Sequence, residues 1–175
     1  GSNEDATMFS SLKEGLIKIS FFVAYIYIIS LMNDIKRVFQ YHGAEHKSIF
    51  AYEKGLELTV DNVKKMPRLH PRCGTNFIFV VLMVSTFVFS FFTFENVLTR
   101  SILKLIFFPV VAGIAYEIIK IAGKYQNPFT RVLILPGLLM QKITTREPDE
   151  KQIEVAIAAL QATLDKTEVV SPSPT

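Results

Sequence analysis

The chain has 175 residues, of which 50% are hydrophobic and 20% charged, with a formal net charge of +3. This length predicts a single domain, the low net charge gives no reason to expect a nucleic-acid partner, and a single cysteine excludes an internal disulfide framework. The apolar residues are gathered into blocks, which is typical of an integral membrane protein. We therefore expect an all-α membrane fold.

Residues 1–15 form a polar N-terminal segment, and its leading Gly1-Ser2 pair is typical of a cloning remnant. The first apolar block covers Ile19–Met32, and it reaches back to Leu16 if the Lys18 ammonium extends to the interface. We predict the first transmembrane helix over residues 16–32.

The next segment, residues 33–76, contains eight Lys and Arg residues. The stretches SIFAY and LELTV have apolar faces, which predicts an ordered loop of helix and turns. This loop contains HGAEH, residues 42–46, and, close to its end, HPRC, residues 70–73. All three histidines and the only cysteine of the chain therefore lie between two apolar blocks.

Two further spans are predicted, over residues 77–94 and 102–121. The first is eighteen uncharged residues, which as a helix cover about 27 Å of a bilayer core of about 30 Å. The second contains Pro109 and Gly113, which we expect to kink or loosen it. Residues 131–141 are too short to span and are broken by Pro136-Gly137, so a re-entrant or interfacial segment is expected there. Residues 16–144 would form the membrane domain.

Residues 145–166 are predicted to form an amphipathic, water-facing helix. Its apolar residues recur at helical spacing, and they are Ile153, Ala156, Ile157, Leu160 and Leu164. This face must pack on something, and a protein partner is one possibility. Residues 167–175 are expected to be a disordered tail.

The distribution of basic residues predicts the orientation. Eight Lys and Arg lie in residues 33–76 and seven follow Ile119, whereas the other side of three spans holds four. The positive-inside rule then makes the loop and the C-terminus cytoplasmic, with the N-terminus outside.

The candidate metal site follows from this topology. His42 and His46 are one helical turn apart and can grip one Zn²⁺, while Glu45 beside them can act as general base, as in the reversed zincin order H-x-x-E-H. His70 and Cys73 have the spacing of a turn that offers imidazole and thiolate. Glu117 lies near the cytoplasmic end of the third span. Zn²⁺ or another divalent metal is thus expected.

Simpler interpretations remain open for the same residues. The two histidines of HGAEH would then be interfacial residues with their polar edges in water, and Cys73 would be a packing residue at a helix start. Glu117 would pair with Lys120 on one helix face. Arg68 and Arg72 would bind anionic lipid headgroups.

The stretches YHGAEHK, HPRCGTNF and TTREPDEKQIEVAIAAL resemble the YqhQ-like family over nearly the whole chain. This family consists of uncharacterised bacterial membrane proteins described as predicted metal-dependent enzymes. The resemblance implies a metal at His42, Glu45, His46, His70 and Cys73, and a location in the bacterial inner membrane. Family members usually have a further N-terminal region, so we expect a C-terminal portion or a short form.

Two functions fit these observations. In the first, the chain is a membrane-embedded metalloenzyme, a hydrolase that acts on a lipid headgroup or peptide bond at the cytoplasmic face. In the second, four protein ligands close a structural site, and the C-terminal helix docks a partner. Neither function fixes an oligomeric state.

Overall fold

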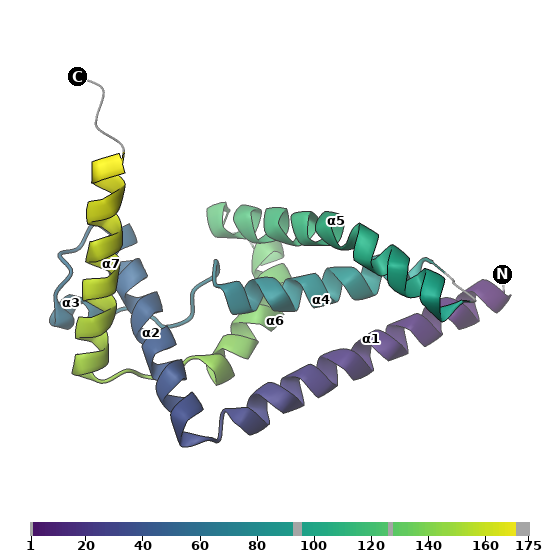
Figure 1. Cartoon of the computed structure of the whole chain (residues 1–175), viewed down its shortest axis with the longest axis horizontal. Coiled ribbons are helices and arrows are strands. Elements are labelled where there is room, and N and C mark those ends of the chain that lie inside the picture. The colour runs from purple at the N-terminus through teal and green to yellow at the C-terminus, as the bar shows by residue number, and fades with distance from the viewer. Residues whose placement is uncertain (1, 93–95, 126–127, 171–175) are drawn as a thin grey trace. The chain divides into compact units, whose positions relative to one another are not determined.

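The computed structural model describes residues 2–92, 96–125 and 128–170, which form helices and turns only (Figure 1). The expected all-α class is confirmed over these residues. The helices described are α1 (Ser2–Ile29), α2 (Asn33–Glu53), α3 (Val60–Lys64), α4 (Gly74–Ser90), α5 (Val97–Lys124), α6 (Pro128–Thr144) and α7 (Glu150–Val170).

The chain divides into two compact units, although its length predicted one domain. One comprises residues 1–27 and 71–141, and we call it the apolar unit; the other comprises residues 28–70 and 142–175, and we call it the histidine unit. Each unit is thus built from two separate stretches of chain. The expected membrane domain, residues 16–144, does not coincide with either unit, because the basic loop packs with the C-terminal helix.

The core of the apolar unit lies between α4 and α5, which run side by side (Figure 1). Val80 of α4 packs there with Ala115 and Ile119 of α5. α5 is the one described helix that is long and apolar enough to cross a membrane by itself, and a second candidate arises only if residues 12–29 and 33–53 count as one broken span. α4, the expected second span, has 17 helical residues, and residues 93–95 lie outside the described part. Of the described helices, one or two therefore meet the requirements of a span, and the expected number of about three stays a prediction.

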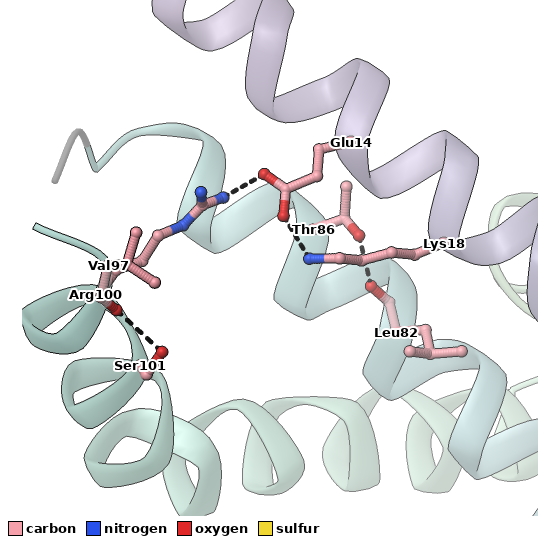
Figure 2. A network of polar contacts seen from close by, with 7 residues as sticks. All are labelled: Glu14, Lys18, Leu82, Thr86, Val97, Arg100 and Ser101. Atoms are coloured by element: carbon pink, nitrogen blue, oxygen red, sulfur yellow. Dashed lines mark hydrogen bonds and ion pairs between the residues drawn. The ribbon is translucent and has the colours of Figure 1, made fainter. Parts of the chain in front are cut away.

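α1 is tied to the rest of the apolar unit by a small polar network (Figure 2). The carboxylate of Glu14 accepts hydrogen bonds from the Lys18 ammonium, at 2.5 Å, and from the Arg100 guanidinium of α5. A Cβ on Gly15 would lie 2.0 Å from Cγ2 of Thr86, so α1 closely approaches α4 at this glycine. The α1 helix begins well before residue 16, where the first span was predicted.

The expected break at Pro136-Gly137 is wrong, because α6 continues through both residues as one helix. At Gly137 the α6 helix instead packs closely on Asn76, which is fully buried. A Cβ at this glycine would lie 1.5 Å from Oδ1 of Asn76. α5 likewise continues through Pro109. A proline thus removes one hydrogen bond in each helix without ending it.

The histidine unit is built on α2 and α7, which lie side by side, with α3 against both (Figure 1). Its core consists of Ala44, Ala51, Val63, Ile153, Ala156 and Ile157. Three of these residues belong to the apolar face predicted for the C-terminal helix. That face therefore packs on the basic loop of the same chain.

Local signals fix the ends of these helices. α2 ends in a Schellman motif, in which Gly55 adopts φ +66° and Leu56 N–H donates to Ala51 O at 3.0 Å. α7 begins with a capping box, because Asp149 and Gln152 each accept the other's backbone N–H at 2.8–2.9 Å. α7 extends to Val170, so residues 167–170 of the expected tail are helical, and residues 171–175 lie outside the described part.

Candidate metal site

The site is organised by a close approach of the chain to α2. A Cβ on Gly43 would lie only 2.1 Å from the backbone oxygen of Arg146. The Arg146 N–H donates to Phe39 O at 2.8 Å, which fixes residues 144–147 along the helix. We call residues 144–147 the strap. Gly43 is therefore required where the helix and the strap meet, which offsets its low helix propensity.

The strap and the turn after α3 orient two imidazoles. Nδ1 of His42 lies 2.8 Å from Thr144 O, and Nδ1 of His46 lies 2.5 Å from Arg68 O. A carbonyl oxygen only accepts, so in each ring Nδ1 carries the proton. In the neutral ring Nε2 then bears the lone pair, which is the usual arrangement of a metal-ligating histidine.

His70 joins these two rings. The ring centroids of His42 and His46 are 4.4 Å apart, and those of His46 and His70 are 5.7 Å apart. Two imidazoles that bind one tetrahedral ion at 2.0–2.1 Å place their centroids about 5 Å apart. The two centroid distances lie on either side of this value.

Sequence reasoning missed Glu53, which lies beside the third histidine. Oε2 of Glu53 is 3.4 Å from Nε2 of His70, and the ring of Phe50 packs on the same imidazole at 4.6 Å. His46, Phe50 and Glu53 follow the i, i+4, i+7 spacing of one helix face. That periodicity could have identified Glu53 as an orienting carboxylate.

Cys73 and Glu117 belong to the apolar unit, so the structure does not place them relative to the three rings. Cys73 occupies the N-cap position of α4 and is buried. It follows His70 by three residues, which keeps the two Cα atoms within about 11 Å of each other through the chain. Glu117 is exposed and pairs with Lys120 at 3.2 Å, as the simpler interpretation predicted.

Glu45 is exposed on α2, between buried Ala44 and buried His46. No contact of its carboxylate fixes a direction toward the imidazoles. Its assignment as general base therefore rests on the sequence pattern alone.

Ion pairs hold the parts of the site together. Lys47 is buried, and its ammonium donates to Glu147 at 2.6 Å and to Lys64 O at 3.1 Å, which links α2 to the strap and to α3. On the surface Lys64 pairs with Glu150 at 2.8 Å. Their hydrogen bond lowers the pKa of the Glu150 carboxyl and raises the pKa of the Lys64 ammonium.

The donor set fits a borderline-soft divalent ion. The candidate donors are imidazole nitrogens and a thiol, which suit Zn²⁺ better than Mg²⁺ or Ca²⁺, because these two ions prefer oxygen.

Comparison with known proteins agrees with these motifs. A family described as "Protein of unknown function (DUF1385)" matches residues 3–166. The chain belongs to this family. "Uncharacterized protein YqhQ" of Bacillus subtilis (strain 168) is 42% identical over 152 residues, which cover 86% of this chain and 48% of the relative. The chain spans about half the length of this curated relative. No solved structure matches.

Proposed function

We propose that this member of the family is a membrane-embedded, zinc-dependent hydrolase that acts at the cytoplasmic membrane face. The observation that carries the proposal is the pair of imidazoles whose Nδ1 atoms lie 2.8 Å and 2.5 Å from backbone carbonyls. Histidines that bind a metal usually donate their other ring N–H to a carbonyl or carboxylate, and both rings have such a partner here.

The membrane location is supported by the length and apolarity of α5. The multi-pass arrangement in a bacterial inner membrane is proposed from the apolar blocks that precede and include α5. The cytoplasmic orientation is proposed from the basic residues of the histidine unit, by the positive-inside rule.

In the proposed mechanism His42 and His46 would hold the ion through Nε2, while the carbonyls of Thr144 and Arg68 orient the two rings. His70 or Cys73 would complete the protein ligands. A divalent ion bound there would supply a Lewis acid and a water of lowered pKa. The Glu45 carboxylate would accept a proton from the attacking water as general base.

The proposal is tested by the metal content of detergent-purified protein. We expect about one zinc per chain, lost in His46→Ala and kept in Glu45→Gln, because the two imidazoles still bind. Glu154→Gln, another exposed glutamate of the histidine unit, is the matched control. Absence of metal from the wild type and all variants would refute the site. Loss in Glu45→Gln alone would make Glu45 a ligand and not a base.

A structural site is the second candidate, because His70 and Cys73 could close the coordination with His42 and His46. X-ray absorption spectroscopy distinguishes the two. Three nitrogens and one sulfur without oxygen would favour the structural site, and an oxygen ligand would favour the enzyme. Once a substrate is identified, Glu45→Gln should lower the rate by about 10²–10⁴ in the enzyme and leave the structural protein unchanged. In the structural case a protein partner would contact the outer side of α7, where Val155 is exposed.

A further inference from the structure

A small cavity of about 70 Å³ lies in the apolar unit between α1, α4 and the start of α5. Pockets that hold drug-sized molecules have about 300–1,000 Å³, so this cavity has room for one small chemical group. It adjoins the polar network of Figure 2. Its polar lining consists of Glu14, Lys18, Ser85, Thr86, Arg100 and Lys104.

Most of these polar side chains already have partners within the apolar unit. Glu14 accepts hydrogen bonds from both Lys18 and Arg100, and it thereby ties α1 to α5. The Thr86 hydroxyl donates to the backbone oxygen of Leu82 at 2.8 Å. These contacts form the wall of the cavity, and no ligand is needed to satisfy them.

Lys104 and Ser85 line the same cavity but form no hydrogen bond or ion pair within the described part of the chain. The Lys104 ammonium lies 5.6 Å from the centre of the Phe89 ring, and this cation–π contact provides no oxygen acceptor for its three N–H groups. Two donor side chains from different helices are thus open to one small cavity. A ligand that bridges them must offer acceptor atoms.

The position of Lys104 along α5 indicates where such an acceptor comes from. α5 has 28 residues, which cover about 42 Å, close to the roughly 40–45 Å of a bilayer with its headgroup regions. Lys104 follows Val97, the first residue of α5, by about 10 Å, which is near the edge of the hydrocarbon core. A lysine ammonium at this depth extends toward the interface, where the phosphates of the lipid headgroups lie.

We propose that this cavity binds the phosphate group of a phospholipid, with Lys104 and Ser85 as the donors. The ammonium supplies a charge-assisted hydrogen bond, and the hydroxyl orients a second oxygen. The acyl chains remain outside the small cavity, on exposed apolar residues of the neighbouring turns, which are Leu16 and Ile17 of α1 and Leu105 of α5. The proposal rests on the proposed membrane location and does not involve the metal site.

Native mass spectrometry of the full chain, purified in a neutral detergent and stripped of metal, tests the proposal. The probes are phosphatidylglycerol, diacylglycerol with the same acyl chains, and inorganic phosphate. The test variants are Lys104→Gln and Ser85→Ala. Two controls lie outside the cavity lining: Lys13→Gln removes an exposed ammonium that also contacts a ring, that of Phe9 at 4.3 Å, and Ser101→Ala removes an exposed hydroxyl of α5.

We expect phosphatidylglycerol to bind the wild type and both controls equally. Its affinity should fall about fivefold in Lys104→Gln, the usual contribution of one cation beside an anionic headgroup. A fall of about fivefold is also expected in Ser85→Ala, from the loss of one hydrogen bond. Diacylglycerol lacks the phosphate and should bind about 25-fold more weakly, because it loses both contributions. Inorganic phosphate should not displace the lipid, and the zinc content of unstripped variants should equal that of the wild type.

Four results would overturn the proposal. Equal loss in Lys13→Gln would indicate non-specific charge attraction, and equal binding of diacylglycerol would show that the phosphate takes no part. Displacement of the lipid by inorganic phosphate would make this a site for the free anion. Unchanged affinity in Lys104→Gln would exclude its ammonium as a donor. If Lys104→Gln does not fold, Ser85→Ala decides the question against Ser101→Ala in the same way.

Discussion

Gly43→Ala separates helix propensity from tertiary packing in the histidine unit. On an isolated helix this change is stabilising, by about 1 kcal/mol. In this chain the new methyl group would lie 2.1 Å from the carbonyl oxygen of Arg146, more than 1 Å closer than ordinary contact. The atom it meets belongs to backbone, so the strap must move.

Overpacking of this kind costs about 1–3 kcal/mol. Movement of the strap also weakens the Arg146 N–H to Phe39 O bond, which contributes about 1 kcal/mol. After the propensity gain is subtracted, we expect a net destabilisation of about 1–3 kcal/mol. Since Thr144 moves with the strap, the His42 ring loses its fixed carbonyl partner, and zinc affinity should fall about 10- to 100-fold.

Gly113→Ala is the matched control, because nothing lies within 4 Å of a Cβ at that position of α5. It should be neutral or stabilising. Thermal unfolding followed by circular dichroism compares the two variants with the wild type. Each kcal/mol of destabilisation should lower the melting temperature by about 2–4 °C. Zinc titration of both variants measures the effect on the site.

The two substitutions must therefore act in opposite directions. If Gly43→Ala raises the melting temperature as much as Gly113→Ala does, the strap does not contact α2 as described. Unchanged zinc affinity in a destabilised Gly43→Ala protein would show that the Thr144 carbonyl does not position His42.

Three further results are expected. Glu147→Gln should destabilise the histidine unit by about 1–3 kcal/mol in chemical denaturation, because it removes the negative charge that pairs with the buried Lys47 ammonium. An effect no larger than that of Glu150→Gln would contradict this. The pKa of the Glu150 carboxyl is lowered by its pair with Lys64, so this pair stabilises the fold at neutral pH. The contribution is lost as the pH falls below 4.5 through the shifted pKa. The melting temperatures of wild type and Glu150→Gln should therefore differ slightly at pH 7 and converge at low pH or at high salt. Lys54→Cys, at an exposed position, should resist an impermeant thiol reagent in intact cells, and efficient labelling from outside would reverse the proposed orientation.

The sequence predicted the helices well and their lengths less well. Apolar blocks and helical periodicity indicate where helices form, which is why the all-α class and the helix containing Ile153 and Ala156 were predicted. Pro136 was interpreted as a break because helix propensity describes a residue without its contacts to the rest of the fold. Gly137 of α6 closely approaches Asn76, which is far away in the chain, and no local sequence pattern predicts such an approach.

The candidate site, too, depends on contacts between residues that are far apart in the chain. The spacing of His42 and His46 on a helix indicated a shared face, but their tautomers depend on carbonyls of Thr144 and Arg68. Gly43 was counted against the helix, whereas the strap makes it necessary. Glu117 was predicted as a ligand because a carboxylate at the edge of a span needs a partner, and Lys120 supplies one in the structure.

The division of each unit between two stretches of chain determines when the site can form during synthesis. His42 is 102 residues away from Thr144, the residue whose carbonyl holds its ring. At the usual 5–20 residues per second, α2 would wait about 5–20 s on the ribosome before the strap emerges, and longer before α7 covers it. Meanwhile α4, α5 and α6 are made and the apolar face of α2 stays open. The nascent chain is thus exposed to chaperones in this interval, and the histidine cluster proposed to bind zinc forms only after nearly the whole chain has been translated.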